Sequence, residues 1–284
     1  MAPRESQEDM TARIERERRA AQLQRESALE GSLEGFRVGS VPYLNAAPLT
    51  RGIEDQIQHV VPSKLAQMLQ RDELDAALVS IVEVLFTGRY DLLDGIAIAS
   101  LGEVYSVFLA HKKPIEQVDL VYCDPASLTS VHLLKVLLAE RGLFPQFKPL
   151  PHLEGVNELD YVLLIGNPGI EFRRAPHTQE IFDLGAAWYE LTKLPFVYAG
   201  WALQRNQKNE ALRIQLREAK GFGMDTLDFL IDSRPEYDRA FRKDYLGWHI
   251  HYHLGADEKR GIQKFVEYLR KYSGREVFEP TYVY

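Results

Sequence analysis

Short apolar runs alternate with helical segments from Phe36 onward, and this alternation constrains the fold more than any other feature of the chain. The strand-like runs are FRVGSV (36–41), IQHVV (57–61), DAALVS (75–80), VDLVYCD (118–124) and YVLLIGN (161–167). Helical patterns such as KLAQMLQRDE (64–73) and SLTSVHLLKVLLAERG (127–142) separate them. Strands that alternate with helices are typical of α/β proteins with parallel sheets. The sequence therefore predicts two parallel-rich sheets covered by helices.

The pattern restarts after Lys112-Lys113-Pro114, and we place the boundary between two lobes there. The apolar run FVYAGWALQ (196–204) then predicts the crossover back to the first lobe. We therefore expect lobe 1 to comprise residues 36–112 and 200–284, and lobe 2 to comprise residues 113–199. Ligands of such folds bind in the cleft, near the carboxyl ends of strands and the amino ends of helices.

Three further segments have simpler patterns. We expect GIEFRRAPHT (169–178) to form a loop, residues 206–273 to be helical, and REVFEPTYVY (275–284) to contribute a closing strand.

Residues 1–35 form a charged arm in which Ile14, Leu23 and Leu29 are too few to bury an apolar stripe. The arm is therefore expected to be a solvated, flexible helix, with a partner-binding helix as the alternative. It lacks the apolar core of a signal peptide, and we expect a cytoplasmic protein.

Composition excludes several classes of function. The net charge of −7 argues against a broad nucleic-acid interface, because such an interface needs a basic face. The single cysteine, Cys123, excludes an intrachain disulfide and a cysteine-based zinc site. No run of about 18 apolar residues is present, so we expect no membrane span. The sequence leaves the oligomeric state open.

Two motifs that suggest cofactors are weak. HIHYH would place His249, His251 and His253 on one face of a strand, but no carboxylate or thiol nearby has ligand spacing. GFGMD (221–225) follows no strand and lacks the third glycine of a dinucleotide fingerprint. We therefore predict neither a metal nor a cofactor.

Short polar residues stand at four strand-to-helix junctions, where candidate binding residues are expected. These are Tyr43 and Asn45 in SVPYLN, Ser80 after DAALV, Ser127, Thr129 and Ser130 in DPASLTSV, and Gly166 and Asn167 in GNPG. Each polar side chain either caps its helix, which is the more common role, or faces a ligand. Helix starts supply free N–H groups and a positive dipole end, so the set suits a small anionic ligand even in an acidic protein.

Six segments in order resemble one known family. They are RVGSVPYLNAAPL (37–49), LDAALVSIVEVL (74–85), VYSVFLAHKKPI (104–115), DPASLTSVHLLKVLL (124–138), VLLIGNPG (162–169) and FDLGAAWYELTKLPFVYAGWA (182–202). Together they resemble the chorismate dehydratases of the futalosine route to menaquinone, from Phe36 to the end of the chain. YLNxxPL and DLGxxWxxxTxLPFVxAxW are specific as a pair.

The resemblance implies a two-lobed fold like that of type II periplasmic binding proteins. It implies that chorismate, a small dicarboxylate, loses water to give 3-[(1-carboxyvinyl)oxy]benzoate. Asn45 matches an essential asparagine of the family and Ser106, in VYSV, an active-site serine. We expect Asn45 to hydrogen-bond the leaving hydroxyl or orient the ring, and Ser106 to hold a polar group. Relatives often carry Asp in place of Asn167, which puts a charge-dependent role there in doubt.

The same resemblance implies roles for the remaining junction residues. Ser127, Thr129 and Ser130 would bind a carboxylate, while Tyr43, Ser80, Gly166 and Asn167 line the cleft. Two alternatives stay open: a non-catalytic small-carboxylate binding protein of the same fold, and the sister enzyme 1,4-dihydroxy-6-naphthoate synthase.

Overall fold

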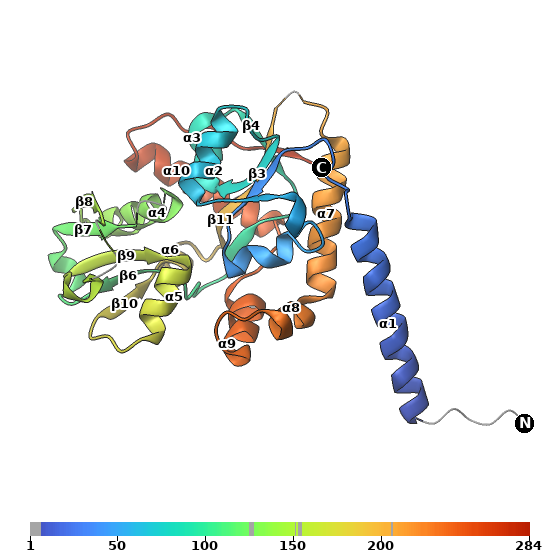
Figure 1. The fold of residues 1–284 in the computed structure, drawn as a ribbon. Helices are drawn as coiled ribbons and strands as arrows, with labels where there is room; N and C mark the ends of the chain where they lie inside the picture. The colour runs from blue at the N-terminus through green and yellow to red at the C-terminus, as the bar shows by residue number, and fades with distance from the viewer. Residues whose placement is uncertain (1–6, 125–127, 151, 153–154, 206) are drawn as a thin grey trace, which may run out of the picture.

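The computed structural model describes residues 7–124, 128–150, 152, 155–205 and 207–284, and within these the strands form two sheets (Figure 1). The larger sheet has the spatial order β12-β4-β11-β3-β1-β2, with β5 also paired to β11. Its strands are β1 (Val38–Ser40), β2 (Gln58–His59), β3 (Ala76–Ser80), β4 (Tyr90–Leu93), β5 (Ile98–Ser100), β11 (Phe196–Gln204) and β12 (Thr281–Val283). The smaller sheet has the order β10-β6-β9-β7-β8. Its strands are β6 (Val107–His111), β7 (Leu120–Cys123), β8 (Gln146–Pro149), β9 (Tyr161–Ile165) and β10 (Glu180–Asp183).

Helices cover both sheets. They are α1 (Gln7–Leu29), α2 (Pro62–Gln70), α3 (Ile81–Thr87), α4 (Leu128–Ala139), α5 (Gly166–Arg174), α6 (Leu184–Thr192), α7 (Glu210–Asp225), α8 (Leu227–Ser233), α9 (Arg239–Asp244) and α10 (Ala256–Tyr272). Short 3₁₀ helices are η1 (Leu44–Leu49), η2 (Glu54–Gln56), η3 (Ile115–Gln117) and η4 (Val156–Glu158), and η5 (Tyr245–His249) is a π-helix. No helix among the described residues is long and apolar enough to cross a membrane.

The sheets are mixed, which corrects the expectation of parallel-rich sheets. β1 pairs in parallel with β2 and β3, and β7 in parallel with β8 and β9. β11, however, runs antiparallel to β3, β4 and β5, and β6 runs antiparallel to β9 and β10. β6 is the strand by which the chain enters the smaller sheet, and β11 is the strand by which it returns to the larger sheet. Each of them therefore runs antiparallel to all its neighbours.

The strand assignments also move the expected lobe boundary. β6 was expected in lobe 1 but belongs to the smaller sheet, since it pairs with β9 and β10. The first crossing between the sheets therefore lies between β5 and β6, before residue 112. The return strand β11 begins at Phe196 in the larger sheet, and the closing strand β12 pairs in parallel with β4.

One predicted loop is a helix. Residues 166–174, which include all of GIEFRR (169–174), form α5, and only APHT (175–178) of the expected loop lies outside it. The sequence GNPG reads as a turn, but Pro168 lies in the first turn of the helix, where its missing N–H has no intrahelical partner to lose. The helix that was expected after the GNPG junction therefore begins at Gly166 itself and occupies most of the expected loop.

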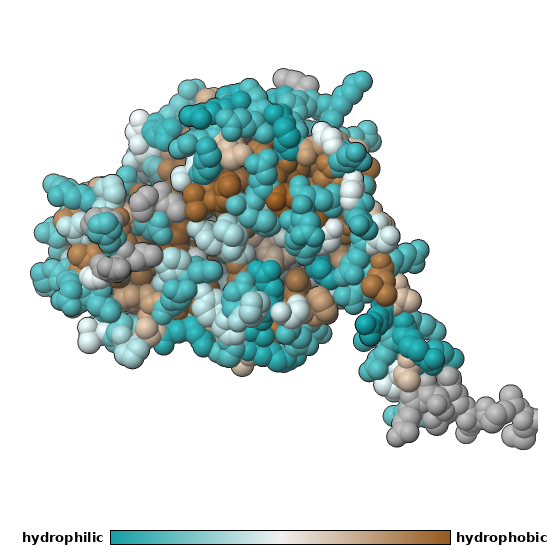
Figure 2. All heavy atoms as spheres, in the orientation of Figure 1, coloured by the Kyte–Doolittle hydropathy of each residue, from teal (hydrophilic) through white to brown (hydrophobic). Residues whose placement is uncertain are grey.

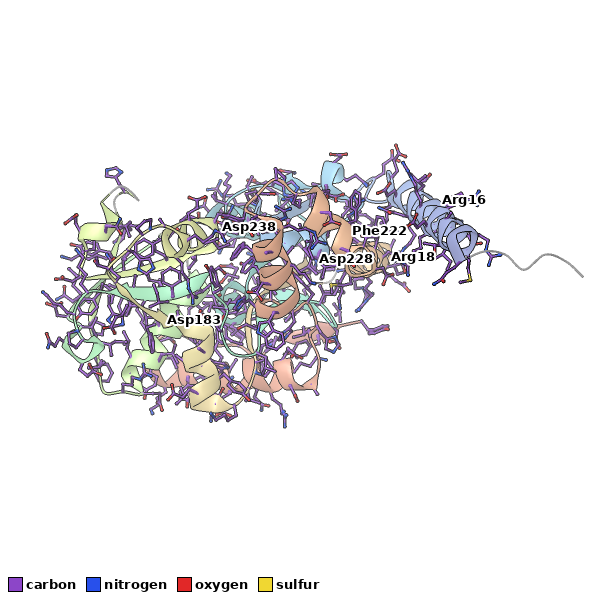
Figure 3. The ribbon with its side chains drawn as sticks, turned by 90° about the horizontal axis from the view of Figure 1, so that it is seen from below. Arg16, Arg18, Asp183, Phe222, Asp228 and Asp238 are labelled. Atoms are coloured by element: carbon purple, nitrogen blue, oxygen red, sulfur yellow. The ribbon has the colours of Figure 1, made fainter. Side chains whose placement is uncertain are left out.

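The amino-terminal arm is a helix that projects from the body and packs only at its base (Figures 1 and 3). Leu29 is buried, and Arg25 forms an ion pair with Asp225 of α7 at 2.5 Å. The guanidinium of Arg25 also lies 5.2 Å from the centre of the Phe222 ring. Hydrophilic side chains dominate the rest of the helix (Figure 2), as expected from its few apolar residues.

Helix α7 packs unusually close to η1, the segment that carries Asn45. A Cβ atom added to Gly223 would lie 2.0 Å from the carbonyl oxygen of Pro48, which no backbone can accommodate without moving. Gly223 of GFGMD therefore serves helix packing. Gly221, two residues earlier on α7, has only the flexible guanidinium of Arg25 at 3.3 Å from such a Cβ.

We predict that Gly223→Ala lowers the free energy of unfolding by about 1–3 kcal/mol, because the methyl group forces α7 away from η1. Gly221→Ala is the matched control. It should be neutral or stabilise by up to about 1 kcal/mol, since alanine is the better helix former. Urea unfolding of both variants beside the wild type measures the difference. Equal stability of the two variants would contradict the close packing of α7 on η1.

Candidate functional site

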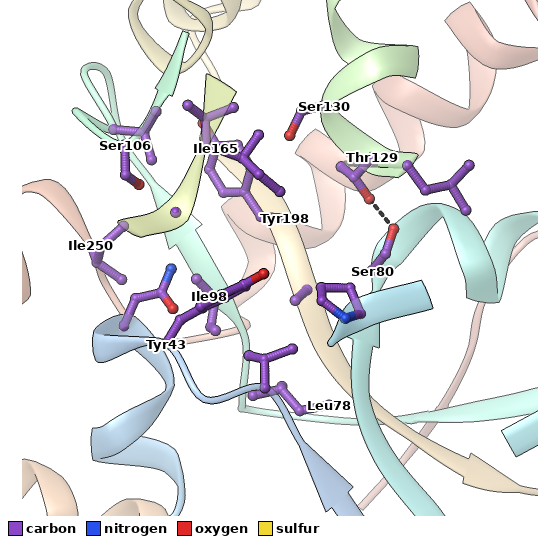
Figure 4. Close-up of a pocket in the computed structure, with 18 residues that line it drawn as sticks. Tyr43, Leu78, Ser80, Ile98, Ser106, Thr129, Ser130, Ile165, Tyr198 and Ile250 are labelled. Carbon is purple, nitrogen blue, oxygen red and sulfur yellow. Dashed lines mark hydrogen bonds between the residues drawn. The ribbon is translucent and has the colours of Figure 1, made fainter. Parts of the chain in front are cut away.

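A pocket lies between the two sheets and takes residues from both (Figure 4). β3, β5 and β11 of the larger sheet, with Val41 directly after β1, contribute on one side, and β6 and β9 of the smaller sheet contribute on the other. The lining residues are Val41, Tyr43, Asn45, Pro62, Leu78, Ser80, Ile98, Val104, Ser106, Val107, Leu128, Thr129, Ser130, Ile165, Gly166, Tyr198, Ala199 and Ile250. The pocket therefore lies at the place where the chain crosses between the sheets.

No lining residue that the structure describes carries a charged side chain. The polar groups are hydroxyls and one amide, from Tyr43, Asn45, Ser80, Ser106, Thr129, Ser130 and Tyr198. Helices α4 and α5 also begin at the pocket wall, with Leu128 and Gly166. Such a set binds an anion through hydrogen-bond donors and helix ends.

Asn45 and Ser106 lie in this pocket and share a neighbour that sequence reasoning missed. The buried Tyr245 hydroxyl donates a hydrogen bond to Ser106 Oγ at 2.8 Å. Burial raises the pKa of Tyr245, while hydrogen bonds with the side chains of Ser106 and Asn45 act in the opposite direction. The Oδ1 atom of Asn45 is buried and has no hydrogen-bond partner among the described residues. Asn45 lies inside η1, whose N-cap residue is Tyr43, so of the two roles left open for Asn45 it does not cap the helix.

Ser80 and Thr129 join the two halves of the pocket. Ser80 is the N-cap residue of α3, yet its hydroxyl bonds to the hydroxyl of Thr129 rather than to its own helix (Figure 4). Thr129 Oγ1 in turn accepts from the Val82 N–H of α3 at 3.3 Å. A side chain of α4 therefore caps a helix of the other sheet.

Gly166 lies close to the ring of Tyr43 in the pocket lining. Gly166 has φ +58°, and a Cβ atom there would lie 3.7 Å from the Tyr43 ring. Burial, followed by the negative charge of Asp124, raises the pKa of the Tyr43 phenol. Tyr43 is therefore protonated at neutral pH and available as a hydrogen-bond donor.

The other predicted residues have different outcomes. Ser130 is buried and lines the pocket, whereas Asn167 is absent from the lining. Ser127 lies outside the described residues. Tyr198 is a pocket residue that sequence reasoning missed, although a phenol within the apolar run FVYAGWALQ was a signal for it. Its hydroxyl lies 3.2 Å from Ser100 Oγ.

A buried carboxylate fixes the backbone that presents Ser106. Asp183 accepts hydrogen bonds from the N–H groups of Val104 at 3.1 Å, Tyr105 at 2.9 Å and Ala186 at 3.0 Å. Tyr105 has φ +67°, and the Ser106 N–H bonds to the Val104 carbonyl at 2.8 Å, which makes a γ-turn centred on Tyr105. Positive φ at a bulky residue is strained and persists only where neighbours enforce it.

Arg173 of α5 supports the same turn. Its guanidinium lies 4.1 Å from the centre of the Tyr105 ring and donates to the Tyr105 carbonyl at 3.2 Å. It also lies 3.5 Å from the Asp183 carboxylate and pairs with Glu103. Burial raises the pKa of Asp183, and its three backbone N–H partners act in the opposite direction. Asp183 stands in the DLG motif, but the motif alone does not reveal this role.

The three histidines of HIHYH do not share a strand face, because His249 closes the π-helix η5 and His251 makes an isolated bridge to Ala99. His249 contacts Asp244 at 3.2 Å and His251 contacts Glu258 at 3.1 Å. Among the described residues, no group of three potential ligands has the geometry to hold a metal ion.

The part of the chain that forms the pocket matches a known protein family. The sequence profile of a family described as menaquinone biosynthesis matches residues 36–271, most of the chain and all the described pocket residues. The chain belongs to this family. The match begins after the arm, at the residue where the alternating pattern starts.

Two relatives that this chain resembles in sequence are chorismate dehydratases. A chorismate dehydratase of Thermus thermophilus is 34% identical over 258 residues, which cover 82% of this chain and 95% of the relative. A chorismate dehydratase of Campylobacter jejuni is 26% identical over 230 residues, which cover 79% of this chain and 89% of the relative.

Solved structures similar to this family member share its fold. A protein from Archaeoglobus fulgidus has a TM-score of 0.64 at 19% identity, covering 83% of this chain and 97% of that one. The periplasmic aliphatic sulphonate binding protein SsuA from Escherichia coli has a TM-score of 0.58 at 15% identity, covering 88% and 93%. The expected two-lobed fold of periplasmic binding proteins is confirmed.

We predict that Asp183→Ala lowers the free energy of unfolding by about 2–4 kcal/mol, because it leaves one buried and two partly buried N–H groups without their acceptor. Glu103→Ala is the control, since Glu103 pairs with the same arginine but is largely exposed. It should cost less than about 1 kcal/mol. Denaturant unfolding measures both, and a similar cost for the two variants would contradict the role of Asp183 in the turn.

Proposed function

We propose that this protein is a chorismate dehydratase, a hydro-lyase that converts chorismate to 3-[(1-carboxyvinyl)oxy]benzoate and water. The observation that carries the proposal is the 34% identity to the Thermus thermophilus enzyme over 82% of the chain. The pocket supports it independently, because its hydroxyls, amide and helix starts suit a small dicarboxylate.

The reaction removes a ring hydrogen and the hydroxyl group on the neighbouring carbon. The electron pair of the breaking C–H bond becomes the new ring double bond, the C–O bond breaks, and the hydroxyl leaves with a proton as water. The carbon that loses the proton is conjugated through a ring double bond to the ring carboxylate. Negative charge that develops on this carbon is therefore delocalised toward the carboxylate. Formation of an aromatic ring then drives the elimination.

The polar groups of the pocket fit a reaction in which the substrate supplies its own base. Serine, tyrosine and asparagine are poor bases at neutral pH, and the described lining contains no carboxylate, histidine or lysine. We propose that the enolpyruvyl carboxylate of chorismate takes the ring proton. The enzyme then contributes by holding one conformation and by stabilising the charge that develops.

We assign the leaving hydroxyl to Asn45 and Ser106, which lie together beside Tyr245. The Asn45 amide offers both a donor and an acceptor, and its Oδ1 has no partner among the residues described. The two carboxylates are assigned to the helix starts at Thr129, Ser130 and Gly166. These assignments rest on the position of the residues in the pocket.

The decisive experiment mixes the purified protein with chorismate and follows the products by chromatography with mass detection. We expect an aromatic product that has lost one water molecule. Asn45→Ala should lower kcat by about 100-fold or more, because it removes a group that binds the reacting centre. Asn157→Ala, at an exposed position of η4, is the matched control and should keep normal turnover.

Three results would contradict parts of this proposal. Tight chorismate binding in calorimetry without turnover would indicate a binding protein of the same fold. The absence of both binding and turnover would point to the sister synthase or to an unrelated ligand. Normal turnover by Asn45→Ala would leave the activity in place and refute the assignment of Asn45.

A further inference from the structure

Tyr245 lies directly behind the predicted catalytic pair, outside the pocket lining. It is the first residue of the π-helix η5 and is almost fully buried. A π-helix is rare, and where one occurs it frequently accompanies a functional site. The Tyr245 ring stacks on Phe241, with ring centres 5.5 Å apart and an interplanar angle of 10°. The phenol is therefore held in one orientation.

The direction of the hydrogen bond between Tyr245 and Ser106 is informative. The phenol O–H donates to Ser106 Oγ at 2.8 Å, so it occupies one lone pair of the serine oxygen. The serine proton cannot then point back at Tyr245 and is free to point into the pocket. A hydroxyl that accepts one hydrogen bond is also a stronger donor in the next, because chained hydrogen bonds polarise one another.

The Asn45 side chain lies beside the same phenol and, with Ser106, lowers its pKa against the effect of burial. The hydrogen bond that Tyr245 donates is the one to Ser106, one of the two residues assigned to the leaving hydroxyl. A phenylalanine in its place would stack on Phe241 equally well, so packing alone does not require the hydroxyl group. The hydroxyl instead occupies the Ser106 oxygen and so limits where the serine proton can point.

We propose that Tyr245 is a positioning residue that orients the Ser106 hydroxyl as a hydrogen-bond donor toward the leaving hydroxyl of the substrate. This inference rests on the proposed dehydratase function. Tyr245 touches no substrate atom in this arrangement and acts through Ser106.

The test compares kcat and KM for chorismate in wild type, Tyr245→Phe, Ser106→Ala and the double variant. Tyr245→Phe should lower kcat by about tenfold with little change in KM, the scale of one hydrogen bond made in the transition state. In the Ser106→Ala background, the same substitution should change kcat by less than about twofold, because the group through which Tyr245 acts is gone.

Tyr90→Phe is the matched control. Its hydroxyl is equally buried but has no hydrogen-bond partner among the described residues, so its removal should leave kcat and KM unchanged. The control separates the loss of a particular hydrogen bond from the loss of any buried phenol oxygen.

The outcomes separate this proposal from the function on which it rests. A normal kcat in Tyr245→Phe would refute the role of Tyr245 while the dehydratase activity stands. The same holds if the loss of kcat in the double variant equals the product of the losses in the two single variants. A wild-type protein without turnover would refute the function and this role together. A tenfold loss that vanishes in the Ser106→Ala background would support both.

Discussion

The carboxylate of Asp183 is the interaction on which the pocket depends, because it holds the connection between the two sheets in one shape. It caps α6 and binds the N–H groups of Val104 and Tyr105, which lie between β5 and β6. These contacts enforce the strained γ-turn at Tyr105 and so set the position of Ser106. The crossover from one sheet to the other is thereby also the site of the predicted chemistry. A connection without this anchor would relax to ordinary backbone angles and move Ser106.

The absence of charged side chains from the described pocket lining imposes a second constraint. An anionic substrate in such a pocket must be held by hydroxyls, an amide and helix starts, which are weak acids and bases. The chemistry available to the protein is then limited to orientation and hydrogen bonding. This limit agrees with an elimination that needs no strong protein base, since the substrate carries a carboxylate of its own. The pattern of residues and the proposed reaction thus support each other.

The sequence predicted the fold well where the signal was local. Apolar runs gave β1, β3, β7 and β9, and the alternation with helices gave the two-lobed architecture that the solved structures confirm. It failed where the partner of a segment decides its structure. Nothing in VYSVFLAH shows that it pairs with β9 and β10 rather than with the larger sheet. GIEFRRAPHT was expected to be a loop, but its first six residues complete α5, whose helical form the local pattern does not reveal.

The candidate site shows the same division. Junction residues such as Asn45, Ser80 and Thr129 were found because short polar residues after strands are visible in sequence. Tyr245 and Asp183 were missed as site residues because their partners are far away along the chain. Tyr245 bonds to a residue 139 positions earlier, and Asp183 to one 79 positions earlier. Such pairings exist only after the two sheets have assembled.

The close approach of α7 to η1 has a mechanical consequence for the projecting arm. Gly223 of α7 touches the segment that carries Asn45, and its neighbour Phe222 contacts Arg25 at the base of α1. One turn of α7 therefore supports both the wall of the pocket and the root of the arm. Because α1 spans 23 residues and contacts α7 at its base, a partner bound along α1 would act on the same turn of α7 that packs against the pocket wall.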